Sequence, residues 1–169
     1  MGDSLAAIIM GSSSDWPLVK KAADTFDALG VKYDARVMSA HRTPDALREY
    51  VKSARAAGVK VFIGAAGKAA HLPGVIASYT SAPVIGLPIK SSALDGMDAL
   101  LSMAQMPPGV PVATVAIDGA ENAALLAAQI LALSDSALSD KLERHRQSMA
   151  RAVEKSDMDL RSSLHGEKT

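Results

Sequence analysis

The sequence predicts an α/β fold in which helices cover both faces of a parallel sheet. Short apolar runs such as Leu5 to Met10 (LAAIIM) and Pro83 to Leu87 (PVIGL) alternate with segments of helical periodicity. Such runs are typical of strands buried on both faces, and strands that alternate with helices of about 10–15 residues form right-handed βαβ units. The 169 residues suffice for one domain that needs no disulfide or metal to stabilise it.

The first third of the chain predicts two strands and two helices. The strand from Leu5 to Met10 precedes a helix from Asp15 to Leu29, with Asp15 as its expected cap, a proline in its first turn and a glycine at its end. A mixed strand spans Val31 to Met38. Thr43-Pro44-Asp45 then opens a second helix with a cap, a proline and an acid near the positive end of the helix dipole.

The third and fourth strands are short and apolar. Val59 to Ile63 forms the third strand, which we expect to end in the loop from Gly64 to Lys68 (GAAGK). A helix from His71 to Tyr79 follows, and Pro83 to Leu87 forms the fourth strand.

The chain after residue 95 is mostly helical. Segments 96–105 and 122–133 predict helices, and Val110 to Ile117 predicts a fifth strand between them. A polar helix follows from Ser136 to about Val153, and the remaining residues show no periodicity. We therefore expect one domain over residues 1–155, with a C-terminal helical extension and a flexible tail over 156–169.

Charge and composition exclude several classes of protein. Lys+Arg and Asp+Glu are 18 each, and this neutral balance argues against a nucleic-acid or membrane-surface partner, which would require a basic excess. Cysteine is absent, which excludes a thiolate zinc site and a cysteine nucleophile. Because the chain shows neither a signal-peptide pattern nor an apolar stretch of about 18 residues, we expect a cytoplasmic protein.

Ligands of such folds bind beyond the carboxyl ends of the strands, so the loops that follow each strand are the candidate site. The first loop, Gly11-Ser12-Ser13-Ser14-Asp15, combines a glycine turn, hydroxyl groups and a helix N-terminus, which together favour an anion. The alternative is plain helix capping by Ser14 or Asp15, which leaves the serine run unexplained.

The second loop, Ser39 to Pro44, holds His41 and Arg42 just before a helix N-terminus. Histidine exchanges protons near neutral pH, and arginine presents a planar fork to a phosphate or a carboxylate. The alternative is a surface histidine beside a solvated arginine.

The third loop, Gly64 to His71, matches neither a Walker motif nor a dinucleotide fingerprint. Phe62 and Ala69 stand where a Walker motif has a glycine and a Ser or Thr, and the G-x-G-x-x-G spacing is absent. The loop can still approach a ligand closely. Its His71 either faces that ligand or bonds to backbone at the start of the helix.

The later loops and the C-terminal segment hold the remaining polar residues that we considered as site candidates. Lys90 and Asn122 lie in the later loops and could reach a ligand, although Asn122 also suits a helix cap. The last two histidines, His145 and His165, are expected in solvent. No carboxylates accompany His41 and His71 at metal-ligand spacing, so no metal site is expected.

Three stretches in order, GSSSDW (11–16), SAHRTPD (39–45) and AAHLPG (69–74), resemble the PurE family over roughly residues 5 to 135. The resemblance implies a three-layer α/β/α, flavodoxin-like fold, a homo-octamer, and no metal or organic cofactor. It also implies the class I activity, N5-carboxyaminoimidazole ribonucleotide mutase in purine biosynthesis. The alternatives are the class II carboxylase, which adds CO2 to aminoimidazole ribonucleotide, and a non-catalytic nucleotide-binding module.

The resemblance also assigns site residues. His41 matches the catalytic histidine, and Ser12, Asp15 and Arg42 match substrate-binding positions. Six further residues would line the same pocket: Gly11, Ser14, Ser39, Gly67, Lys68 and His71.

The third loop departs from the family pattern at two positions. Ala65 and Lys68 stand where the family pattern GAGGAAHLPG has glycine. An alanine at 65 would be costly if that position needed a positive φ. Lys68 either contacts a phosphate or carboxylate or points to solvent.

Overall fold

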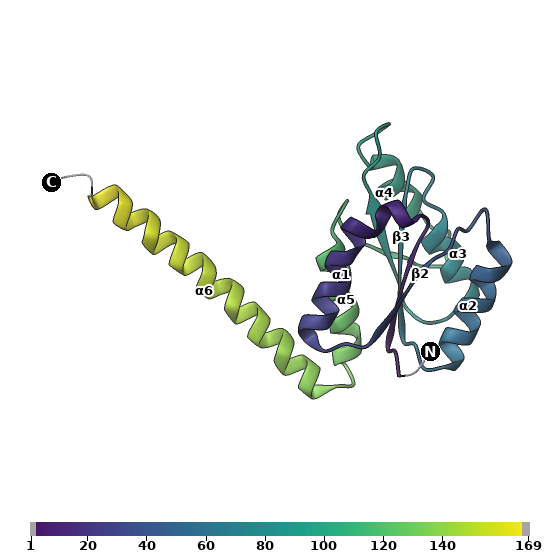
Figure 1. The fold of residues 1–169 in the computed structure, drawn as a ribbon, viewed down its shortest axis with the longest axis horizontal. Coiled ribbons are helices and arrows are strands. Elements are labelled where there is room, and N and C mark those ends of the chain that lie inside the picture. The colour runs from purple at the N-terminus through teal and green to yellow at the C-terminus, as the bar shows by residue number, and fades with distance from the viewer. Residues whose placement is uncertain (1–2, 167–169) are drawn as a thin grey trace.

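The structure, a computed structural model, describes residues 3–166 (Figure 1). Its centre is a five-stranded sheet of order β2-β1-β3-β4-β5, in which all four pairings are parallel. The strands are β1 (Ala6–Met10), β2 (Tyr33–Val37), β3 (Val61–Gly67), β4 (Val84–Ile89) and β5 (Ala113–Thr114). This strand order is the flavodoxin-like one, so the predicted fold class is confirmed.

Helices cover both faces of the sheet (Figure 1). On one face α1 (Trp16–Leu29) and α5 (Ala120–Ala132) pack together, and on the other lie α2 (Pro44–Ala56), α3 (Leu72–Tyr79) and α4 (Met97–Ala104).

The side chains of strand β1 are all apolar, with no alternation of polar and apolar residues, because both faces of the strand are covered. Ala6, Ile8 and Met10 belong to the core on the α1 and α5 side, whereas Ala7 and Ile9 belong to the core on the other side. All five side chains are buried, as expected for a strand between two helical layers.

Strand β3 is longer than predicted. It continues past Ile63 to Gly67, so half of the expected third loop is strand. Its last four residues pair with β4, from Gly64 opposite Gly86 to Gly67 opposite Ile89. The small side chain at position 64 is required there, because an added Cβ would lie 3.0 Å from the Cα of Pro73 in α3.

Strand β5 is shorter than predicted. Only Ala113 and Thr114 pair with β4, whereas the expected strand ran from 110 to 117. Pro111 has no N–H to donate to a ladder, and the segment lies at the sheet edge, where it has a neighbour on one side only.

The C-terminal helix differs most from the prediction. Helix α6 spans Ser136–Gly166, so the expected end near Val153 is wrong and the boundary between residues 155 and 156 falls inside the helix. Ion pairs at i,i+4 spacing, Lys155–Asp159 and Asp157–Arg161, bridge successive turns of the segment that lacked apolar periodicity. The rest of the predicted tail, residues 167–169, lies outside the described residues.

Helix α6 extends away from the sheet and its covering helices (Figure 1). Its first turns contact them, since Leu138 is buried in the α1 and α5 core. Within residues 3–166, no helix has the length and apolar character needed to cross a bilayer.

Candidate active site

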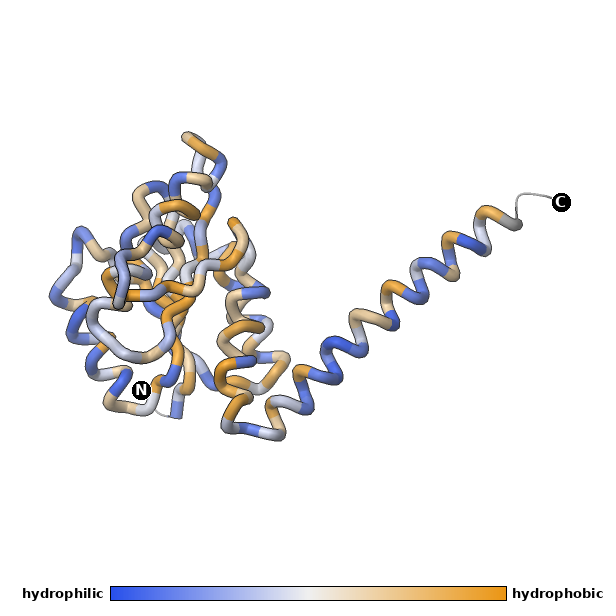
Figure 2. Tube along the Cα trace, turned by 180° about the vertical axis from the view of Figure 1, so that it is seen from behind, coloured by the Kyte–Doolittle hydropathy of each residue, from blue (hydrophilic) through white to orange (hydrophobic). Residues whose placement is uncertain are grey.

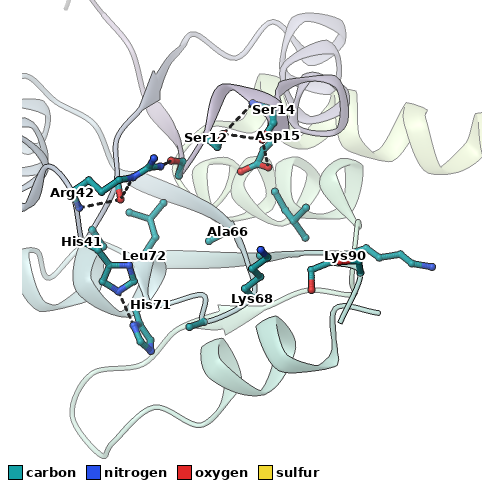
Figure 3. A pocket seen from close by; sticks show the side chains of 18 residues that line it. Ser12, Ser14, Asp15, His41, Arg42, Ala66, Lys68, His71, Leu72 and Lys90 are labelled. Atoms are coloured by element: carbon teal, nitrogen blue, oxygen red, sulfur yellow. Dashed lines mark hydrogen bonds between the residues drawn. The ribbon is translucent and has the colours of Figure 1, made fainter. Parts of the chain in front are cut away.

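A cavity of about 490 Å³ lies at the carboxyl ends of the strands, where the fold predicts ligand binding. The structure brings all ten predicted site residues together around it (Figure 3). They come from the ends of β1, β2 and β3 and the loops that follow: Gly11, Ser12, Ser14, Asp15, Ser39, His41, Arg42, Gly67, Lys68 and His71.

The first loop turns through a short 3-10 helix, η1 (Ser13–Asp15), before α1 begins. Ser12 provides the cap, because its Oγ accepts from the backbone N–H of Ser14 at 3.3 Å and from Ser14 Oγ at 2.8 Å. The expected caps, Ser14 and Asp15, do not cap α1 with their side chains. The Asp15 carboxylate is therefore available to the cavity.

The Asp15 carboxyl has a raised pKa. Partial burial is the largest cause, because it removes water from the ionised form. Hydrogen bonds with the Ser14 side chain and the Ser12 backbone act in the opposite direction. A ligand hydroxyl that donates to Asp15 would replace part of the lost hydration.

Thr43 holds the second loop rather than capping α2. Its Oγ1 accepts from the Ser39 N–H at 3.0 Å and donates to the Ser39 carbonyl at 3.1 Å, and it makes no side-chain cap contact with the helix. The loop between these two residues, which carries His41 and Arg42, is thus closed by local hydrogen bonds.

Arg42 joins the first and second loops. Its Nε donates to Ser39 Oγ at 3.4 Å, and its Nη2 donates to the carbonyl of Gly11 at 3.0 Å. A guanidinium has five N–H donors, so these two contacts fix its plane and leave other donors for an anionic ligand.

His41 and His71 contact each other directly. His41 Nε2 lies 2.8 Å from His71 Nδ1, and the rings meet edge to face at 84° (Figure 3). At this distance one of the two nitrogens donates and the other accepts, so a single proton lies between them. His71 precedes α3 as expected, but its side chain bonds to His41 and not to helix backbone.

In the third loop, the residue with a strained backbone conformation is Lys68 and not Ala65. Ala65 is buried within β3 and pairs with Leu87, so its backbone is extended and the alanine carries no penalty from a positive φ. Lys68 has φ 55°, a left-handed conformation that costs a non-glycine residue about 1–2 kcal/mol. Its side chain extends into the cavity (Figure 3).

The loop after β4 completes the cavity with residues that the site prediction did not include. Lys90, Ser91 and Ser92 line the cavity, and of these three only Lys90 is a candidate from the sequence. Lys90 Nζ pairs with Asp95 at 3.3 Å. Asn122 is wrong as a candidate, because it lies inside α5 and lines another hollow.

The other histidines do not reach the cavity. His145 in α6 is half-buried rather than solvent-exposed, and its Nε2 is buried without a hydrogen-bond partner in the described part of the chain. The side chain of His165 lies outside the described residues. Within the described chain, no three His, Cys, Asp or Glu side chains come together as metal ligands.

Comparison with known proteins identifies the family. The sequence model of the AIR carboxylase family matches residues 5–152. The chain belongs to the AIR carboxylase family. Family members include the N5-carboxyaminoimidazole ribonucleotide mutase of Pyrococcus abyssi, 54% identical over 89% of this chain and 87% of that protein.

Two further relatives extend the comparison. The protein of the same name from Bacillus subtilis is 55% identical over 88% of this chain and 93% of its own length. A crystal structure of Treponema denticola PurE superposes with a TM-score of 0.86 at 32% identity, covering 93% of this chain and 98% of that one. The family resemblance suggested by the three sequence stretches is thereby confirmed.

Proposed function

We propose that this protein is an N5-carboxyaminoimidazole ribonucleotide mutase of purine biosynthesis, an isomerase that moves a carboxyl group from the exocyclic nitrogen to carbon 4 of the imidazole. The observation that carries the proposal is the placement of His41, at 2.8 Å from His71, in one cavity with Arg42 and Asp15. The high identity to proteins of that name supports the same activity.

His41 acts as the general acid and then as the general base. It first donates a proton to the carbamate nitrogen, whose bond to the carboxyl carbon breaks to give the amine and CO2. Carbon 4 then attacks CO2, and the proton that carbon 4 loses returns to His41. One histidine suits both steps near neutral pH, and the cavity keeps CO2 beside the carbon that attacks it.

The remaining residues bind the ribonucleotide. Arg42, with the hydroxyls and N–H groups of the Gly11 to Asp15 turn, holds the phosphate. Asp15 accepts hydrogen bonds from the ribose hydroxyls. Acid-base transfer and anion binding suffice for this reaction, so we propose that it uses no cofactor.

A class II carboxylase is the second candidate, because the family to which the chain belongs is the AIR carboxylase family. The two functions differ in the substrate that is consumed. A mutase converts the N-carboxylated ribonucleotide directly, whereas a carboxylase requires aminoimidazole ribonucleotide and CO2.

The decisive experiment supplies both substrates separately and follows product by ultraviolet absorbance. We expect the wild type to convert N5-carboxyaminoimidazole ribonucleotide and not aminoimidazole ribonucleotide with bicarbonate. The reverse preference would establish the carboxylase, and binding without turnover of either would indicate a non-catalytic module.

The variant His41→Asn tests the assigned role. We expect turnover to fall by at least about 100-fold, the usual contribution of a general acid-base group, while calorimetry shows that the ribonucleotide still binds. Full activity of His41→Asn would refute the role of His41.

The cellular compartment and the oligomeric state of the protein are also proposals. We propose a cytoplasmic enzyme that forms a homo-octamer, built from the single α/β domain and its helical extension. The family resemblance and the exposed apolar side chains of α6 support this assembly.

A further inference from the structure

We infer that Lys68 binds the carboxylate that the reaction transfers, and that it is a specificity-determining residue for the carboxylated ribonucleotide. The inference rests on the proposed function and adds a role for a residue at which this chain departs from the family pattern.

The backbone of Lys68 is the first observation. Residues 3–166 contain four non-glycine residues with positive φ, and the other three are aspartates, whose short side chains tolerate this conformation better. Glycine would adopt φ 55° without strain. A long side chain at such a position, on the wall of a cavity, indicates that the side chain itself is used.

The charges around the cavity are the second observation. Arg42, Lys68 and Lys90 line it as cations, and Asp15 is the one carboxylate among the lining residues. This excess of positive charge suits a ligand with more than one anionic group, as a carboxylated ribonucleotide has.

The three cationic side chains differ in the contacts that they already make within the chain. Arg42 is held by Gly11 and Ser39, beside the turn that offers N–H groups to a phosphate. Lys90 is paired with Asp95. Lys68 forms no ion pair within the described part of the chain.

The position of Lys68 points to the base end of the substrate. It follows β3 on the segment that also carries His71, the contact of His41. Figure 3 shows its amino group directed into the cavity between the His41–His71 pair and Lys90, apart from the Arg42 guanidinium. A phosphate held at Arg42 therefore leaves the carboxylate of the imidazole as the anion for Lys68.

The charge of the transferred carboxyl group changes during the reaction, and this determines how Lys68 affects KM and kcat. The carboxyl is anionic in both substrate and product and neutral as CO2, so Lys68 stabilises the two bound end states and not the intermediate. Because this stabilisation is absent at the CO2 stage, it lowers KM without raising kcat, and its loss raises KM without lowering kcat.

The test compares Lys68→Gln with the wild type by calorimetry, using two ribonucleotides that differ in the carboxyl group alone. These are 4-carboxy-5-aminoimidazole ribonucleotide and aminoimidazole ribonucleotide. We expect Lys68→Gln to bind the first about tenfold more weakly, the effect of losing one charge-assisted hydrogen bond, and the second within twofold of the wild type. In turnover, we expect KM to rise and kcat to stay unchanged or to increase.

Two further variants keep the result interpretable. Lys68→Gly removes the amine and the strain together, so it should raise Tm and still lose affinity for the carboxylated ligand. Lys52→Gln removes an exposed lysine of α2 outside the cavity and should bind both ligands as the wild type does.

Three outcomes overturn the inference. Equal weakening for both ribonucleotides would place Lys68 at the phosphate, and no weakening for either would place it in solvent. A fall in kcat at constant KM would contradict a role that is confined to the two bound end states. Because these measurements compare two bound ligands, they remain readable even if the wild type shows no mutase turnover, which would refute the proposed function alone.

Discussion

At the scale of single residues, the contact between His41 and His71 is the feature with the clearest chemical consequence. The nitrogen of His41 that faces His71 shares one proton with it at 2.8 Å, so His71 orients the ring and selects its tautomer. We regard His71 as a positioning residue, because it acts on substrate through His41.

The comparison of His71→Ala with His71→Asn tests this role. Alanine removes the partner, and we expect kcat to fall about 10- to 100-fold with a changed pH profile, while KM changes less than about threefold. Asparagine returns a hydrogen-bonding group to the place of Nδ1 and should recover part of kcat. If both variants lose activity only in proportion to a lower Tm, the role of His71 is structural.

Asp15 gives a prediction on stability. Burial raises the pKa of this carboxyl above its unfolded value, so the folded state favours the protonated form and loses stability as pH rises through the raised pKa. Asp15→Asn removes this penalty. We expect Tm at pH 7 to rise by about 1–2 °C, a small value because Asp15 is partly solvated, and no gain below about pH 3.

The matched control for Asp15→Asn is Asp140→Asn on α6, whose side chain is exposed. It should leave Tm unchanged at both pH values. A drop in Tm for Asp15→Asn at pH 7 would show that the ionised carboxylate stabilises the free protein.

At the scale of secondary-structure elements, α6 carries apolar side chains that stay largely exposed in the described part of the chain. Met149, Val153, Leu160 and Leu164 are 47–70% exposed, and their spacing places them on one side of the helix. Hydrophobic residues recur along the whole projecting helix in Figure 2. This side is the surface that we expect to contact other copies in the proposed octamer.

A pair of aspartate substitutions tests that contact. Leu160→Asp places a charge on the apolar side of α6, and Ser162→Asp places the same charge on the opposite side. We expect Leu160→Asp to reduce the mass measured by light scattering and Ser162→Asp to keep the wild-type mass. Equal masses for both variants and the wild type would exclude this side of α6 from the assembly.

At the scale of the whole molecule, the cavity is assembled from residues far apart in the sequence. Arg42 reaches back to Gly11, His41 meets His71, and Lys90 closes the cavity after β4. The parallel order of the strands brings these segments to one edge. The neutral net charge of the chain therefore coexists with a cavity that is locally cationic.

Much of this arrangement could be predicted from the sequence. The apolar runs of β1 and β4 and the glycine and proline signals around α1 and α2 are local, so they determine strand, helix and fold class. The rule that ligands bind at the carboxyl ends then leads to the residues of the first three loops, which the structure places around one cavity.

Other features depend on tertiary contacts and could not be read from local pattern. The extension of β3 to Gly67 depends on pairing with β4, and the length of β5 depends on its place at the sheet edge. The contact of Nε2 of His41 with Nδ1 of His71 and the left-handed backbone of Lys68 arise where separate segments converge. Local pattern is enough to place these residues at the carboxyl edge, because apolar runs mark where each strand ends and a parallel sheet brings those ends together. Which of the residues touch depends on the packed fold, because packing sets the distances between segments that are distant along the chain.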